Sequence, residues 1–193
     1  MRATIPPAAA GAHITRTAAA LTADVRAVVA RGLSPARSAE LVAEALRGYV
    51  MDPGLLTAGQ RIGSPERYTQ HVLHAEPDGS FSVVALVWLP GQHTPIHDHV
   101  SWCVTGVHQG TESEHRYQLV PEGGTARLVA TDVVTNPVGS VCGFAPPGDI
   151  HEVRNSGADT AISLHVYGAD VVRLGSSVRR VYERPAGRAR LTP

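Results

Sequence analysis

The sequence has little cysteine: only Cys103 and Cys142 occur among 193 residues. Two cysteines cannot build the disulfide framework of a small secreted domain, so we expect both to stay thiols in a reducing compartment. The sequence also lacks the run of roughly 20 apolar residues that a membrane-spanning helix needs. Pro6 and Pro7 interrupt the apolar stretch that a secretory signal would require. These absences predict a cytoplasmic protein with no membrane partner.

The charge distribution shows no excess of one sign. The chain carries 17 basic and 17 acidic residues, and its isoelectric point is near 7.2. No basic cluster that could follow a phosphate backbone occurs before the last fifteen residues, so we expect no nucleic-acid partner. The chain also lacks a Walker loop, a dinucleotide fingerprint and a Gly-x-Ser-x-Gly element. Aromatic residues make up only 5%, whereas there are ten histidines, and imidazole is a common ligand of transition metals.

The N-terminal part of the chain has a helical pattern. A length of 193 residues is typical of one domain, so residues 1–193 are expected to form a single domain. Apolar residues recur at helical spacing from residue 14 to residue 50 and predict two helices, separated by Gly32 and Pro35, within a helical segment of about 14–60. Thr22 and Ser34 are the expected N-caps, the latter followed by proline at the first helical position.

The rest of the chain has the pattern of short strands. Runs rich in valine, threonine and tyrosine alternate with glycine, proline and aspartate over about 67–183. Strands at this spacing predict a mainly β sandwich or barrel, which can enclose a ligand site. The tail, residues 184–193, is expected to be mobile. The expected strands are 68–74, 80–89, 94–107, 112–120, 126–134, 140–145, 151–155 and 161–167.

A pair of histidines in one predicted strand can share a metal ion. His97 and His99 are one residue apart, so their side chains point to the same face of a strand, with Cα atoms roughly 6.5 to 7 Å apart. Imidazole donors suit iron, nickel, copper or zinc, and the sequence does not separate these metals.

The spacing around this pair resembles the first motif of the cupin family. Five residues separate Gly91 from His97, and six separate Gly110 from Cys103, which stands where the motif has a glutamate. Residues 146–151 resemble the second cupin motif, although its leading glycine, Gly139, is one residue too far upstream. The resemblance implies a cupin barrel, a double-stranded β-helix with N-terminal helices, in which His151 is the third ligand beside His97 and His99.

A more specific resemblance links residues 68–167 to the cysteine dioxygenase family. The matching segments are Tyr68-Thr69-Gln70, Gly91 to His99, Trp102-Cys103, Gly148 to His151 and Ser163-Leu164-His165-Val166-Tyr167. The resemblance implies a mononuclear Fe(2+) enzyme that adds dioxygen to a small thiol, L-cysteine or 3-mercaptopropionate, and yields the sulfinic acid. Ser163, His165 and Tyr167 alternate on one strand and could form a hydrogen-bonded relay ending at the phenol. In the family this relay holds the tyrosine hydroxyl near the iron.

Two positions bear on the family's subgroups. Cys103 matches the cysteine that in animal members is linked to the tyrosine matching Tyr167, which implies a Cys103–Tyr167 thioether. Gln70 stands where cysteine-preferring members carry arginine, and a neutral amide cannot form the charged fork to a carboxylate. Gln70 and the Gly168-Ala169 pair resemble bacterial members that prefer 3-mercaptopropionate, whereas Cys103 is typical of the cysteine type.

The remaining substrate-binding candidates are Tyr68 and three arginines. Arg173, Arg179 and Arg180 follow the signature strand and could fold over the pocket toward a carboxylate. Another metal-dependent cupin enzyme, acting on a carbon substrate or as an isomerase, and a cupin binding module are the alternative functions. The oligomeric state is expected to be a monomer or a small homo-oligomer.

Overall fold

The computed structural model of the protein describes residues 14–184. Two helices open this region, α1 (Arg16–Val29) and α2 (Pro35–Arg47), as the apolar periodicity predicts. Ser34 caps α2 by accepting a hydrogen bond from the Arg37 amide, and Pro35 occupies its first turn. The prediction that Thr22 caps the first helix is wrong. Thr15 is the cap, and Thr22 lies in mid-helix, where its hydroxyl donates to the carbonyl of Ala18.

Two single-turn 3-10 helices, η1 (Pro53–Leu55) and η2 (Gly59–Arg61), lead from the helices to the strands. Ten strands follow, with the short helix α3 (Val171–Leu174) before the last of them. The strands are β1 (Thr69–Ala75), β2 (Ser82–Trp88), β3 (Ile96–His99), β4 (Cys103–Gln109), β5 (Thr111–Glu122), β6 (Thr125–Pro137), β7 (Val141–Phe144), β8 (His151–Asn155), β9 (Ala161–Tyr167) and β10 (Val178–Tyr182).

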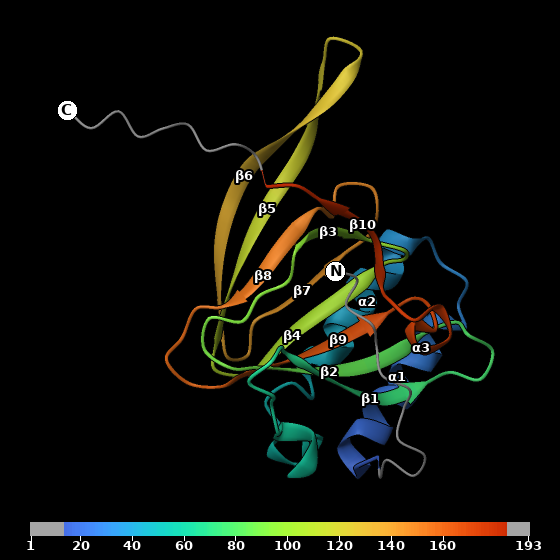
Figure 1. Cartoon of the computed structure of the whole chain (residues 1–193). Coiled ribbons are helices and arrows are strands. Elements are labelled where there is room, and N and C mark those ends of the chain that lie inside the picture. The colour runs from blue at the N-terminus through green and yellow to red at the C-terminus, as the bar shows by residue number, and fades with distance from the viewer. Residues whose placement is uncertain (1–13, 185–193) are drawn as a thin grey trace.

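The strands form two five-stranded antiparallel sheets that face each other (Figure 1). Sheet A has the order β1-β2-β9-β4-β7, and sheet B has the order β10-β3-β8-β5-β6. Neighbours in space are mostly distant in sequence, as in a double-stranded β-helix. The exceptions are the β1–β2 pair and the long β5–β6 hairpin. The β5–β6 hairpin projects beyond the barrel in Figure 1 and turns at Gly123 and Gly124, both with positive φ. The predicted mainly β barrel with N-terminal helices is confirmed.

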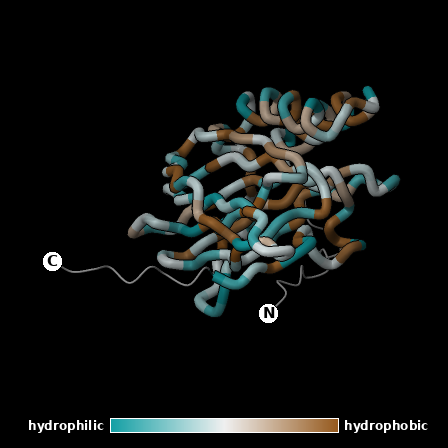
Figure 2. Tube along the Cα trace, turned by 90° about the horizontal axis from the view of Figure 1, so that it is seen from above, coloured by the Kyte–Doolittle hydropathy of each residue, from teal (hydrophilic) through white to brown (hydrophobic). Residues whose placement is uncertain are grey.

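The helices cover the outer face of sheet A, and Figure 2 shows them as a separate layer along one side of the strands. Leu21, Val25 and Leu46 pack there against Val83, Val87 and other outward-facing residues of the sheet. The other residues of β2, Val84, Leu86 and Trp88, point into the barrel and form a second cluster with Tyr167. Because both faces of sheet A are covered, β2 is apolar from Val83 to Trp88 rather than alternating.

Two differences from the predicted strands affect the site. The run 94–107 is not one strand, because the chain leaves sheet B after His99 and enters sheet A at Cys103. No strand was predicted after Tyr167, yet α3 and β10 follow it, and β10 pairs with β3 beside the histidines. The pattern of β10, with two adjacent arginines, has no clear alternation and carried no strand signal.

The glycine at the end of the first cupin motif has a steric role. Gly110 has φ +75 at the turn from β4 to β5, and a Cβ atom there would lie 2.9 Å from the Cα of Ala161. Only glycine fits both constraints.

Two other predictions concern the C-terminal tail and the absence of membrane-spanning helices. Apart from Arg184, the predicted mobile tail lies outside the described residues. Among residues 14–184, no helix has the length and apolarity needed to cross a membrane.

Candidate metal centre

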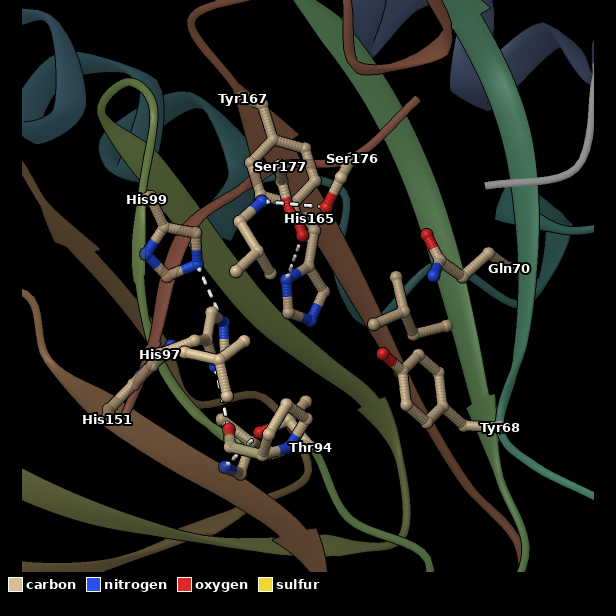
Figure 3. Close-up of a pocket in the computed structure, with 15 residues that line it drawn as sticks. Tyr68, Gln70, Thr94, His97, His99, His151, His165, Tyr167, Ser176 and Ser177 are labelled. Atoms are coloured by element: carbon tan, nitrogen blue, oxygen red, sulfur yellow. Dashed lines mark hydrogen bonds between the residues drawn. The ribbon is translucent and has the colours of Figure 1, made fainter. Parts of the chain in front are cut away.

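Three histidines from two adjacent strands of sheet B meet inside the barrel. His97 and His99 lie on β3, and His151 on β8 is the direct partner of His97. One ring nitrogen of each lies within 4.8 Å of the other two, and all three side chains are buried. In Figure 3 the three rings gather on one side of the cavity. The predicted ligand set therefore converges on one point.

The Nδ1 atom of each ring lies next to a carbonyl or carboxylate oxygen, which carries no hydrogen. His97 Nδ1 lies 3.0 Å from the carbonyl of Pro95, His99 Nδ1 lies 3.2 Å from Asp149, and His151 Nδ1 lies 2.8 Å from Glu114. A carbonyl or carboxylate accepts only, so Nδ1 carries the hydrogen in each ring. Each Nε2 then presents a lone pair to the shared point.

These lone pairs fit a transition-metal ion. The Nε2 atoms of His97 and His99 are 3.2 Å apart, and with both hydrogens on Nδ1 no hydrogen bond joins them. Burial lowers the pKa of His97 and of His99, so both rings stay neutral at neutral pH. Neutral imidazoles whose other nitrogen is bonded to a carboxylate or carbonyl are the usual arrangement of histidine ligands to iron, zinc or copper.

Two buried carboxylates lie behind the ligands. Burial alone would raise the pKa of Glu114, but hydrogen bonds from His151 and Arg116 outweigh it and lower that pKa to about 2. Burial also opposes ionisation of Asp149, whereas its bonds from the side chain and backbone of His99 lower its pKa. Both carboxylates are therefore ionised at neutral pH and offset part of the charge of a bound cation.

Sequence reasoning missed Glu114. Glu112, Glu114 and Arg116 alternate on one face of a predicted strand, and such a pattern usually indicates a solvent-exposed face, so no local signal marked Glu114 as buried. Charged residues on an inward strand face are rare unless they have a specific partner.

The cavity in front of the histidines is small, with a volume of about 30 Å³. Tyr68 and Gln70, the predicted substrate-binding residues, lie across it from the histidines in Figure 3. Ser176 and Ser177, which precede β10, form another part of its wall, and sequence reasoning did not identify them. Within residues 14–184, the side chains lining this cavity include no arginine and no carboxylate.

The predicted relay is present on β9, in the facing sheet. Ser163 Oγ lies 3.0 Å from His165 Nε2, and Tyr167 Oη lies 3.1 Å from His165 Nδ1. Burial lowers the pKa of His165 to about 3 and raises the pKa of Tyr167, so both groups are neutral over the physiological range. The ring of Tyr167 is 6.1 Å from that of His99, which places the phenol beside the histidine cluster.

Cys103 lies next to the end of this relay. It is the direct cross-strand partner of Tyr167, and directly paired residues share one face of a sheet. Its side chain is fully buried, and burial raises the pKa of the thiol. The chain therefore brings together the two residues of the expected thioether.

None of the three candidate arginines lines the cavity. Arg179 pairs with Asp98 at 2.6 Å, on the face of β3 opposite to His97 and His99. Arg173 pairs with Asp170 at the surface, and Arg180 is exposed on β10. Val178 and Val181 of β10 line the cavity instead, because a register shift between Val178 and Arg180 breaks the simple alternation of the strand.

A small barrel of two facing antiparallel sheets, with three histidines converging inside it, has the cupin fold with a three-histidine metal-binding arrangement. Within this class, residues 9–173 match the family described as cysteine dioxygenase type I, and the chain belongs to this family. The resemblance inferred from the sequence motifs is confirmed.

Several solved structures are similar to the chain at low identity. An RmlC-like cupin protein from Desulfovibrio desulfuricans is 19% identical, with a TM-score of 0.41 over 55% of this chain and 88% of that chain. A double-stranded β-helix protein from Klebsiella pneumoniae is 20% identical, with a TM-score of 0.43 over 60% of this chain and 89% of that chain. Oxalate decarboxylase from Lactobacillus farciminis is 19% identical, with a TM-score of 0.41 over 55% of this chain and 30% of that chain.

The hydrogen bond from His151 to Glu114 leads to a first prediction. Glu114→Gln replaces the carboxylate by an amide of the same shape and should weaken metal affinity about 10- to 100-fold, because the ligand loses basicity and orientation. Anaerobic titration with ferrous ion measures this. Glu122→Gln, at the exposed end of the same strand, is the control and should bind as the native protein does. Equal affinity in both variants would exclude a role for Glu114 in metal binding.

Proposed function

We propose that the protein is an iron-dependent thiol dioxygenase that converts a small thiol R–SH and dioxygen into the sulfinic acid R–SO2H. Both oxygen atoms are incorporated, and sulfur loses the four electrons that dioxygen gains. The observation that carries this proposal is the meeting, in one small cavity, of the three-histidine cluster and the Ser163–His165–Tyr167 relay. Family membership supports it.

Iron is the metal that the family favours, although the donor set also suits other ions. His97, His99 and His151 would hold it, and when bound it would activate dioxygen and the thiol sulfur for their reaction. The residues of the chain bind and orient the reactants. The proximity gained by holding both in a cavity of this size contributes to the rate.

Tyr167 is the proposed catalytic residue. Its phenol stays protonated because it is buried, and His165 fixes the position of its oxygen 3.1 Å from Nδ1. From this position the hydroxyl donates a hydrogen bond toward the oxygen being transferred. Ser163 and Trp88 in turn hold His165, since Trp88 Nε1 donates to Ser163 Oγ at 3.1 Å.

The cavity favours 3-mercaptopropionate over L-cysteine as the small thiol. The sequence contains no lysine, and no arginine among residues 14–184 reaches the cavity, so a carboxylate there has only neutral donors. Gln70, Tyr68, Ser176 and Ser177 offer such donors around it. The ammonium group of cysteine would find no carboxylate on the described lining, and burying a charge without a partner is costly.

Oxygen consumption by the iron-loaded protein tests the reaction. We expect one dioxygen per thiol and a product heavier by two oxygen atoms, with 3-mercaptopropionate used more efficiently than L-cysteine or cysteamine. His99→Ala should lose both iron and activity. Tyr167→Phe should keep the iron and turn over about 10- to 100-fold more slowly, the equivalent of one hydrogen bond to a charged group.

Tyr49→Phe is the matched control for this series, because the hydroxyl of Tyr49 bonds Asp24 outside the barrel. It should behave as the native protein does. Iron-loaded protein that consumes no oxygen with any of the three thiols would disprove the proposed activity.

Gln70→Arg tests the polar wall of the cavity. A guanidinium there would pair with a carboxylate, so kcat/KM for 3-mercaptopropionate and for L-cysteine should rise about tenfold relative to cysteamine, which has no carboxylate. Gln118→Arg, at an exposed position of β5, should leave the ratios unchanged. If the two variants give the same ratios, Gln70 does not bind the substrate.

The pairing of Cys103 with Tyr167 supports a thioether between the Cys103 sulfur and the ortho carbon of the phenol. As the carbon–sulfur bond forms, the S–H and ortho C–H bonds break, and two protons and two electrons pass to dioxygen to give hydrogen peroxide. After turnover, a tryptic digest should contain peptides 68–116 and 155–173 joined and lighter by two hydrogen atoms than their sum. Cys103→Ser should abolish the joined peptide and Cys142→Ser should retain it. Only free peptides from the turned-over native protein would rule out the link.

A further inference from the structure

A buried carboxyl group lies at the far end of the relay from the cavity. Glu112 is on β5 in sheet B, points into the barrel and is only 3% exposed. Its Oε1 has no hydrogen-bond partner among the described residues. The Ser163 hydroxyl, which belongs to the facing sheet, is the hydrogen-bonding group that acts on the pKa of this carboxyl. Burying a carboxyl oxygen without a partner is costly, so the position of Glu112 needs an explanation.

The relay has a fixed number of hydrogens, so the state of Glu112 decides how they are distributed. Ser163 has one hydrogen and two lone pairs, and Trp88 Nε1 already donates to one lone pair. The second lone pair and the hydrogen remain for Glu112 and His165. Neutral His165 carries a single ring hydrogen. If that hydrogen is on Nδ1, the ring accepts from Ser163 and donates to Tyr167. If it is on Nε2, the ring donates to Ser163 and accepts from Tyr167.

When Glu112 is protonated, its hydroxyl donates to Ser163, and Ser163 donates to His165 Nε2. The ring hydrogen is then on Nδ1 and donates to the oxygen of Tyr167. The phenol keeps its own hydrogen free to point into the cavity.

When Glu112 is ionised, every bond in the relay reverses. Ser163 donates to the carboxylate, His165 Nε2 donates to Ser163, and His165 Nδ1 accepts the hydrogen of Tyr167. The phenol hydrogen is then turned away from the cavity.

We propose that Glu112 is a positioning residue that sets the direction of hydrogen bonds through Ser163 and His165 and thereby decides whether Tyr167 offers its hydrogen to the cavity. The effect on turnover rests on the proposed function of Tyr167. The reversal of the relay itself does not.

The surroundings of Glu112 place its titration in the range where the enzyme would work. Burial raises the pKa of Glu112 to about 7, opposed by the bond with Ser163 and supported by the charge of Glu114. The pKa of His165 is lowered to about 3, and burial raises the pKa of Cys142 on β7, which faces the same region. Glu112 is therefore the group among these that changes charge near neutrality.

The other strands packed against Glu112 contribute no titratable partner among the described residues. Its cross-strand partners are Asn155 on β8 and Asn136 on β6. The side-chain amide of Asn155 donates to the carbonyls of Trp88 and Asp159. Below pH 7 the relay should hold the orientation that frees the phenol hydrogen, and above pH 7 the reversed one.

Nitrogen-15 NMR of the histidine rings tests this directly in the full-length protein loaded with zinc, a diamagnetic ion. In the native protein the His165 ring should change from the Nδ1–H form at pH 6 to the Nε2–H form at pH 8.5, with a midpoint near 7. Glu112→Gln cannot ionise, so its His165 should keep one form throughout. Glu122→Gln, on the exposed part of β5, should titrate as the native protein does.

Ser163→Ala provides a second route, should Glu112→Gln fail to fold, because it cuts the connection between Glu112 and His165. It should also abolish the change of His165 with pH. A single His165 form in the native protein from pH 6 to 8.5, or a change that persists in Glu112→Gln or Ser163→Ala, would overturn the proposal.

Kinetics then link the relay to turnover. The kcat for thiol oxidation should fall between pH 6 and 8.5 toward that of Tyr167→Phe, with little change in KM, and Glu112→Gln should remove this pH step. An identical step in Glu112→Gln would contradict the inference. If no thiol is oxidised at all, the proposed function fails, whereas the NMR experiment still decides whether Glu112 directs the relay.

Discussion

The structure depends on three buried imidazole rings whose hydrogens are all held on the side away from their meeting point. The carbonyl of Pro95 and the carboxylates of Asp149 and Glu114 each fix one Nδ1, which leaves three Nε2 lone pairs facing one another. Burying such lone pairs without a donor or cation is unfavourable. A metal ion removes this cost, so the arrangement of the acceptors selects cation binding before any substrate arrives.

The two sheets supply different parts of the site. Sheet B carries the histidines and Glu114, and the segment before β8 carries Asp149, whereas sheet A carries the relay from Ser163 to Tyr167. The barrel brings these parts to a common interior because alternate residues of each strand point inward. The interaction of Glu112 with the Ser163 hydroxyl relates the two sheets through polar groups as well as apolar packing.

Charge is kept out of the cavity and placed around it. Arg179 holds β10 to β3 through Asp98, and Tyr182 donates a second bond to the same carboxylate. Arg116 pairs with Glu114 behind His151. The arginines thus stabilise the walls, and the cavity itself offers neutral donors, so a bound metal ion would be the principal charge that a thiolate meets.

The sequence by itself determined the class of the fold and most of the site. Local spacing predicted the helices, most strands and the metal cluster, because strand alternation and the two cupin motifs are properties of neighbouring residues. Only the tertiary structure decided which charged side chains face the interior. Glu112, Glu114 and Arg179 are all plausible surface residues in the sequence, and their burial or partners depend on strands far away in the chain. Contacts across a barrel follow no periodic pattern in the sequence. The carboxylates behind the ligands, strand β10 and the place of Glu112 beside the relay could therefore be identified only in the folded molecule.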